Sequence, residues 1–391
     1  MLLRLPALVL ATALSATFAS APAQAADPER LAPFFDLLSS IESKKLDRVA
    51  KIAWYGDSAV ISDGYTGTLR GKLQARFGDG GPGFILAAAT FDDYLRAGVR
   101  MKRQGWEAQA VISDGLKTGF YGFGGVVSTS FGGASTSFEV KDPSIRAVEV
   151  WYQAGPKAGK LQIFVDGAAK PDATWNTDAA ETGEAVWRFT PEKPAKSIKV
   201  RAAGEGLVRV FGVVLDRDKR GVQLDSVGIL GMRARRWLNA DKDHLKRQVA
   251  QRAPDLIVLN FGGNERVDES LSKSSHKADI EKTLTALKAG APKAACLIVG
   301  PLAHGEEKNG KIVLDADLVT IYEAQREAAT AQGCGFLDLI EAMGGKKALS
   351  NFRDKKLISG DFAHLTNKGH EAVGALISNW ILSRYDAYRK L

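Results

Sequence analysis

The feature that most constrains the fold is a stretch of about 110 residues, 106–215, whose pattern differs from the sequence on both sides of it. Short runs in which apolar and polar residues alternate, such as 147–152 and 161–165, are separated there by turn-rich segments. Helical periodicity is almost absent. Strands at this spacing are typical of an all-β sandwich, and the length suits one such domain.

Both flanks have the pattern of an α/β domain. In the first flank, an apolar run over 49–55 predicts a buried strand that ends in Gly56-Asp57-Ser58 and precedes a helical pattern. In the second flank, 256–261 and 296–300 predict buried strands, and helical patterns lie at about 241–252, 277–289, 316–331 and 367–390. Strands that are apolar throughout and alternate with helices predict a parallel sheet with helices covering it.

The first 25 residues have the pattern of a signal peptide. Arg4 gives a positive start, residues 5–18 are apolar, and Ala23-Gln24-Ala25 matches a cleavage site. We therefore expect cleavage after Ala25 and a periplasmic or secreted protein. The apolar run is shorter than the ~20 residues that a membrane span needs. No later stretch is long and apolar enough, so we expect no transmembrane segment in the mature chain.

Composition narrows the class of partner. Hydrophobic residues make up 45% of the chain and charged residues 25%, which excludes global disorder. The formal net charge of +8 is compatible with an anionic cell-wall polymer as partner, or with solubility alone. Because no block of five to eight residues is rich in Lys and Arg, we expect no nucleic-acid partner.

The two cysteines, Cys296 and Cys334, stand at the starts of two apolar runs. If those runs are neighbouring parallel strands, a disulfide is sterically reasonable, and an oxidising compartment would preserve it. Two buried free thiols are an equally acceptable reading. A zinc site is not expected because the paired cysteine spacing is missing.

Four short segments carry the residues of one possible catalytic site. Ser58 follows the first predicted strand, at the sheet edge where ligands bind in α/β folds. Asp361 and His364, three positions apart before the last helix, have the spacing of an oriented base for a serine nucleophile. Asn264, just after the strand 256–261, and Gly231, which closes a strand-like run, can donate to an oxyanion. Each segment alone is also an ordinary turn, cap or strand end.

Together and in this order, the segments resemble the Ser, Gly, Asn and His blocks of the SGNH (GDSL-type) hydrolase superfamily. The segments 55–58, 66–70 and 76–84 more closely resemble the opening of bacterial peptidoglycan O-acetylesterases, as does Glu265 after Asn264. One departure is Ala59, where relatives often have His. The resemblance implies a flavodoxin-like three-layer α/β fold interrupted by a jelly-roll-like β-sandwich similar to a carbohydrate-binding module. The expected organisation is a signal peptide (1–25), a first hydrolase segment (26–105), the β-sandwich (106–215) and a second hydrolase segment (216–391).

The same resemblance implies the residue roles. Ser58 is expected to be the nucleophile, His364 the general base and Asp361 its orienting carboxylate. The Ser58 and Gly231 N–H groups and the Asn264 amide are expected to form the oxyanion hole. The implied activity is removal of O-acetyl groups from a polysaccharide, with peptidoglycan favoured, through an acetyl-enzyme. An O-acetyltransferase with the same triad and a non-catalytic glycan-binding protein are the alternatives.

Other candidates have weaker sequence support. Asp63 and Tyr65, close to Ser58, and Arg233, close to Gly231, are candidate substrate-binding residues, although a solvated basic helix face explains Arg233 as well. His370, inside the last predicted helix, is a rival base that we expect to be structural. His370-Glu371 begins like a zinc-helix motif, but Gly374 stands where its second His belongs. We therefore expect no metal and no cofactor. The sequence leaves the oligomeric state open, and we favour a monomer.

Overall fold

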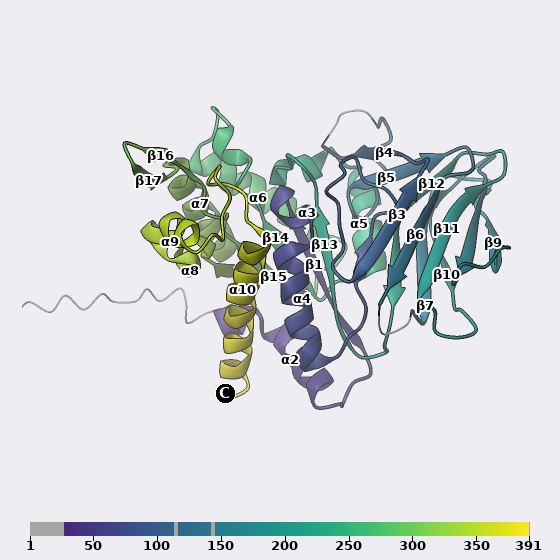
Figure 1. The fold of residues 1–391 in the computed structure, drawn as a ribbon, viewed down its shortest axis with the longest axis horizontal. Coiled ribbons are helices and arrows are strands. Elements are labelled where there is room, and N and C mark those ends of the chain that lie inside the picture. Colours follow the sequence, from purple (N-terminus) through teal and green to yellow (C-terminus); the bar gives the residue numbers. More distant parts are fainter. Residues whose placement is uncertain (1–26, 113–115, 142–144, 391) are drawn as a thin grey trace, which may run out of the picture.

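The computed structural model describes residues 27–112, 116–141 and 145–390. The predicted signal peptide therefore lies outside the described residues. Two antiparallel sheets stand to one side of a helix-covered parallel sheet (Figure 1). Among the described residues, no helix has the length and apolar character needed to cross a membrane.

The parallel sheet confirms the α/β prediction. Its strands, in spatial order, are β13 (Gly221–Gly228), β1 (Val49–Gly56), β14 (Leu256–Asn260), β15 (Ala295–Val299) and β18 (Gly335–Leu337). Every neighbouring pair is parallel. In chain order this is the 2-1-3-4-5 arrangement of flavodoxin-like sheets. Because β1 has a neighbouring strand on each side, it brings Ser58 to an interior position on the carboxyl edge.

Helices cover both faces of this sheet. One face packs on α2 (Ala32–Glu42), α4 (Gly64–Phe77) and α10 (Asn367–Tyr388), and the other on α5 (Lys242–Arg252) and α6 (Lys273–Lys288). Alternation along β1 explains this, because Ile52 and Trp54 join the first core and Ala53 and Tyr55 the second. The remaining helical elements are α1 (Asp27–Arg30), α3 (Ser58–Ile61), η2 (Ala234–Asn239), η3 (Glu265–Val267), α7 (Asp317–Ala331), α8 (Leu339–Met343), η4 (Gly345–Lys347) and α9 (Ala348–Asp354).

The antiparallel strands form two sheets. The first contains β10 (Gly183–Phe189), β7 (Ala147–Ala154), β12 (Val208–Asp216), β5 (Val126–Ser130) and β4 (Glu107–Ala110), and β2 (Gly83–Ile85) pairs with β12. The second contains β3 (Val99–Gln104), β6 (Ser135–Val140), β11 (Ser197–Ala203), β8 (Lys160–Val165) and β9 (Ala173–Asn176). A separate hairpin joins β16 (Gly305–Lys308) and β17 (Lys311–Leu314).

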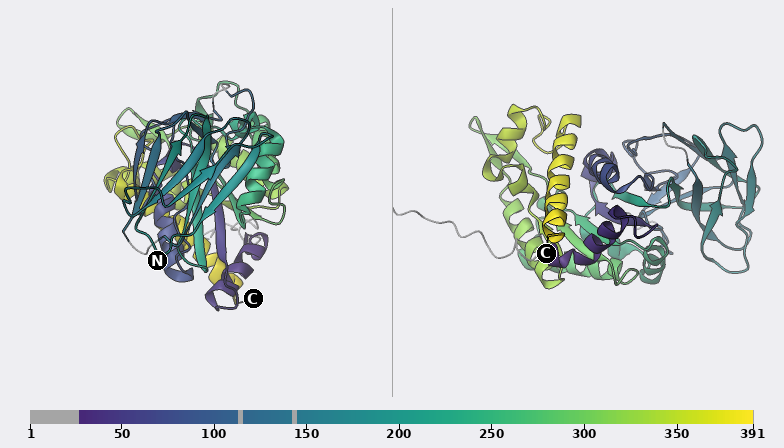
Figure 2. Two further views of the ribbon diagram at one scale, coloured as in Figure 1. Left: turned by 90° about the vertical axis from the view of Figure 1, so that its right-hand side faces the viewer. Right: turned by 90° about the horizontal axis from the view of Figure 1, so that it is seen from below.

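The antiparallel sheets adjoin the α/β region (Figure 2), and the two regions share one apolar core. Buried residues of both sheets, such as Phe138 and Val150, belong to the same apolar core as Tyr55 and Ile257 of the parallel sheet. At the junction, the Tyr55 ring meets the Phe123 ring edge to face, with centroids 5.8 Å apart. The other strands of these two sheets lie within residues 99–216, but β2 also joins the first sheet, so both β2 and β3 begin before residue 106, where the β-sandwich was expected to start.

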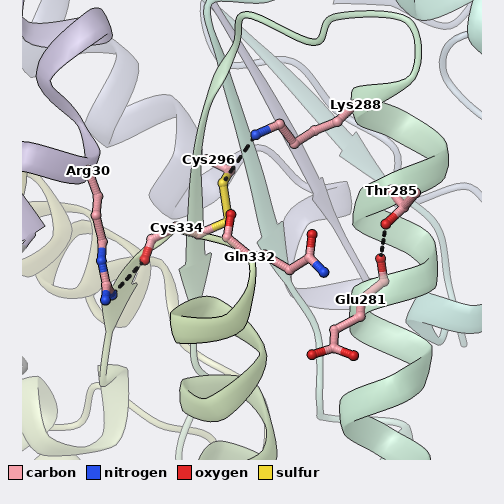
Figure 3. The surroundings of a disulfide bond; sticks show 7 residues. All are labelled: Arg30, Glu281, Thr285, Lys288, Cys296, Gln332 and Cys334. Atoms are coloured by element: carbon pink, nitrogen blue, oxygen red, sulfur yellow. Dashed lines mark hydrogen bonds between the residues drawn. A yellow bond between two sulfur atoms is a disulfide. The ribbon is translucent and has the colours of Figure 1, made fainter.

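The two cysteines form a disulfide, which resolves the alternatives that the sequence left open. Cys296 in β15 is bonded to Cys334, which directly precedes the neighbouring strand β18 (Figure 3). Arg30 donates to the Cys334 carbonyl at 3.0 Å, and Lys288 Nζ lies 3.9 Å from the Cys296 sulfur. The bond lies at the amino ends of its strands, the edge opposite to Ser58.

Candidate active site

Ser58 is held at the carboxyl end of β1 by a tight turn. Gly56 is required there because a Cβ would lie 2.3 Å from a methyl group of Val60. Asp57, in extended conformation, caps α3 by accepting the Ala59 N–H at 3.0 Å. The strand, the turn and the cap therefore place Ser58 at the first position of α3, on the wall of a cavity.

Asp361 and His364 lie on the loop between α9 and α10. The Asp361 Oδ2 and His364 Nδ1 atoms are 2.6 Å apart, and the other Asp361 oxygen accepts the N–H groups of Ala363 and His364, both at 3.0 Å. Burial raises the pKa of Asp361, but the hydrogen bonds from His364 and Ala363 outweigh it and bring the pKa to about 2. Since an ionised carboxylate only accepts, Nδ1 carries the His364 proton, and Nε2 is left to act as a base.

The predicted nucleophile, base and amide meet at one cavity of about 420 Å³. Ser58, Asn264 and His364 all line it, from the ends of β1 and β14 and from the loop before α10. Within the described residues no hydrogen bond joins Ser58 to His364, whose side chain is 69% exposed. Such a contact is often long before substrate binds. The cavity is also lined by Ala59, Leu95, Leu230, Arg266, His304 and His370.

The expected oxyanion donors lie on two adjoining segments. Gly231 follows β13 with a φ of +70°, and its neighbour Leu230 lines the cavity. The Asn264 amide donates one hydrogen bond, to the Met232 carbonyl at 3.0 Å. A side-chain amide has two N–H donors, so the second is left for a ligand. The structure thus places Asn264 beside the Gly231 segment.

Two buried carboxyl groups beside these donors were not predicted. Burial raises the pKa of Asp57 to about 6, against the lowering effect of the Ala59 and Gly263 N–H groups. Burial also raises the pKa of Glu265 to about 7, with the Ala234 N–H opposing it and the nearby Asp57 adding to it. Sequence position alone gives little sign of this, because both residues look like turn residues.

The weaker substrate-binding candidates do not line the cavity. Asp63 is fully buried and bonded to Arg70 at 2.7 Å, because a left-handed turn at Asp63 points the chain into α4. Tyr65 is also fully buried and donates to Asn260 at 2.5 Å. Arg233 forms an ion pair with Asp268 at 2.6 Å. The structure therefore gives all three a supporting contact inside the protein.

Three basic side chains on the cavity wall had no predicted binding role. His304 is held by the Leu302 carbonyl, 2.8 Å from its Nδ1 atom, and Arg266 donates to Asp315 at 2.7 Å. His370, expected to be structural, stacks on the Tyr65 ring and also reaches the wall. The position of Arg266, two residues after Asn264, was the one sequence feature that could have predicted its place on the cavity wall. Among the described residues, no group of three or more His, Cys, Asp or Glu side chains could hold a metal ion.

Comparison with known proteins gives one sequence match and several structural ones. The model of the GDSL-like Lipase/Acylhydrolase family matches residues 198–372, which include Gly231, Asn264, Asp361 and His364. No curated protein matches the chain. A solved structure of a peptidoglycan O-acetylesterase is 22% identical, with a TM-score of 0.76 over 91% of this chain and 96% of that one.

Two further solved structures resemble only a portion of the chain. An acetylxylan esterase from Geobacillus stearothermophilus, solved as a catalytic mutant, is 19% identical with a TM-score of 0.31, over 42% of this chain and 73% of that one. An α/β hydrolase from the metagenome of Lake Arreo is 17% identical with a TM-score of 0.32, over the same shares. Both TM-scores are too low to establish a shared fold, so the likeness in fold rests on the peptidoglycan O-acetylesterase structure.

Proposed function

We propose that this chain, which is a carboxylic ester hydrolase of the GDSL-like, or SGNH, acylhydrolase type, removes O-acetyl groups from a polysaccharide outside the cytoplasm. The single observation that supports this best is the 2.6 Å contact between Asp361 and His364 at the cavity that Ser58 also lines. Peptidoglycan is the first polymer to test, because the solved structure with a TM-score of 0.76 is a peptidoglycan O-acetylesterase.

The proposed reaction has two steps. His364 Nε2 accepts the Ser58 proton while Ser58 Oγ attacks the acetyl carbonyl, and Asp361 stabilises the imidazolium that forms. The developing oxyanion accepts hydrogen bonds from the Ser58 and Gly231 N–H groups and the Asn264 amide. Collapse releases the sugar alcohol, protonated by His364, and leaves acetyl-Ser58. Water, deprotonated by His364, then attacks this ester. The bond between the acyl carbon and Ser58 Oγ breaks, Ser58 Oγ takes the proton back from His364, and acetate leaves.

The remaining elements of the proposal concern location and organisation. We propose export through the signal peptide 1–25 and a β-sandwich at 106–215 between hydrolase segments at 26–105 and 216–391. The disulfide supports an oxidising compartment, since such bonds are rare in the reducing cytosol.

The experiment is hydrolysis of a chromogenic acetyl ester by the wild type and by Ser58→Ala. We expect activity in the wild type and a loss of at least ~10⁴-fold in the variant. Ser383→Ala, an exposed serine near the end of α10, is the matched control and should keep full activity. A wild type inert on acetyl esters and on acetylated glycans would refute the proposal.

A second assay addresses the polymer and the acceptor. Acetate release is compared on O-acetylated peptidoglycan, acetylated xylan and acetylated alginate, and the peptidoglycan is expected to be the best substrate. In the same reactions, free acetate is measured against newly acetylated glycan. Acetylated glycan as the main product would instead indicate transfer of the acetyl group from Ser58 to a sugar alcohol.

A further inference from the structure

The three proposed oxyanion donors come from separate segments that need a common support. Ser58 follows β1, Gly231 follows β13, and Asn264 follows β14. Gly231 and Asn264 both lie past the ends of their strands, so the hydrogen bonds of the sheet do not fix the distance between them. A donor misplaced by about 1 Å can reduce a rate ~10²-fold, so some other group has to set this spacing.

Glu265 makes two hydrogen bonds that connect the two segments. Its Oε1 atom accepts the Ala234 N–H at 2.9 Å, on the segment that follows Gly231, and its Oε2 atom accepts the Gly262 N–H at 3.0 Å, on the segment that bears Asn264. One carboxylate thus joins both segments through backbone atoms. The Asn264 amide adds a third connection by donating to the Met232 carbonyl at 3.0 Å.

Because Glu265 is buried, its two hydrogen bonds are costly to break, and they hold the Gly231 and Asn264 segments together. The side chain is 5% exposed, and a buried carboxylate is unfavourable unless its oxygens are hydrogen-bonded. Here each oxygen is bonded to a different segment, so separating the segments would leave a buried acceptor without its donor. On the other side of Asn264, the Gly263 N–H interacts with the Asp57 carboxylate next to Ser58. The third donor segment is therefore attached to the same loop.

We infer that Glu265 is a positioning residue for the oxyanion hole, holding the Gly231 and Asn264 donors at the spacing that the tetrahedral intermediate requires. This inference rests on the proposed function, since it assigns Glu265 a task in that reaction. Glu265 does not line the cavity and acts through the backbone groups that it binds. Both carboxyl oxygens of Glu265 are needed as acceptors, because a Gln amide nitrogen cannot accept one of the two N–H groups and an Asp side chain is one methylene too short to reach both.

The test compares Glu265→Gln and Glu265→Asp with Glu269→Gln, an exposed glutamate on the same loop as control. For both Glu265 variants we expect kcat on the chromogenic acetyl ester to fall ~10- to 100-fold, with KM changed less than about threefold. Rates are referred to the folded fraction, measured by near-UV circular dichroism. Wild-type kcat in folded Glu265→Gln, even with a lower melting temperature, would overturn the inference. Wild-type kcat in Glu265→Asp would overturn it too, since the charge alone would then suffice.

A second readout separates this inference from the proposed function. A fluorophosphonate attached to Ser58 places a phosphoryl oxygen where the oxyanion would lie, and mass spectrometry gives its rate of attachment without any acetyl substrate. We expect Glu265→Gln to slow this attachment at least ~10-fold and Glu269→Gln to leave it unchanged. If the wild type reacts with the fluorophosphonate but hydrolyses no acetyl ester, the proposed substrate class is wrong while the comparison still decides the role of Glu265. A wild type that shows neither reaction refutes both.

Discussion

Removal of the disulfide is expected to destabilise the protein without changing its chemistry. Cys296 and Cys334 are 38 residues apart, and closing a loop of that length in the unfolded chain corresponds to about 4 kcal/mol of stability in the chain-entropy model. For a chain of this size, each kcal/mol shifts the melting temperature by ~2–4 °C. The Cys296→Ala, Cys334→Ala double variant should therefore melt roughly 8–16 °C below the wild type.

The position of the bond predicts that activity survives. Both sulfur atoms lie at the amino ends of β15 and β18, whereas Ser58 and Asn264 lie at the carboxyl edge of the same sheet. The five residues of β15 span ~16 Å at ~3.3 Å each, so the two ends are well separated. The folded double variant should hydrolyse an acetyl ester at 25 °C with a kcat within about twofold of the wild type.

The assay is thermal unfolding followed by circular dichroism, with and without a reducing agent, in the wild type and the double variant. The reducing agent should lower the melting temperature of the wild type and leave the double variant unchanged. A difference below about 2 °C between the two oxidised proteins would contradict the loop-closure argument. A fall in kcat at 25 °C in a fully folded variant would contradict the claim that the two edges of the sheet act independently.

Three further outcomes follow from the site and its supports. Asp361→Asn should reduce kcat up to ~10⁴-fold with little effect on unfolding, because it spoils the orientation and tautomer of His364 on an exposed loop. Asp63→Asn should lower the free energy of unfolding by about 3–5 kcal/mol in denaturant titrations, because it leaves Arg70 buried beside a neutral group. The folded-state pKa of Glu265, about 7, lies above its ordinary 4.5, so folding binds its proton more tightly. Stability from this group is therefore full below about pH 4.5 and falls by about 3 kcal/mol by pH 7, and Glu265→Gln should remove that component of the pH dependence.

The sequence was sufficient where one strand and one turn determine a position. Buried parallel strands bring their carboxyl ends to one edge, so the segments that follow β1 and β14, which bear Ser58 and Asn264, reach the same cavity. The Asp361 and His364 contact was equally accessible, because a spacing of three positions lets both side chains meet within a single turn of chain. Both predictions needed only the spacing of nearby residues and the rule that parallel strands end at the same edge of a sheet.

The sequence was insufficient where contacts join distant segments. Asp63 is close to Ser58 in the chain, but its side chain faces the interior because it pairs with Arg70 and its backbone is left-handed. Neither the ion pair nor the left-handed conformation could be predicted from the sequence. Arg233 is held by Asp268, 35 positions away, and His304 reaches the cavity only because its loop follows β15. The disulfide likewise could not be assigned from the sequence, because its formation depends on β15 and β18 being neighbouring strands.

Ser58 and Gly231 are separated by more than 160 residues in the sequence, but the two backbone segments that connect the α/β region to the antiparallel strands lie in contact with each other. The chain leaves the α/β region through Gly78–Gly83 and returns at the start of β13, and these two points are in contact. A Cβ on Gly221 would lie 2.2 Å from the Gly78 carbonyl oxygen, and the Phe84 N–H donates to Asp225 of β13 at 2.7 Å. Because the chain returns next to the point where it leaves, β13 pairs directly with β1 although the antiparallel strands lie between them in the sequence. Some of the glycine-rich composition is therefore explained by this crossing, where two backbones approach too closely for side chains.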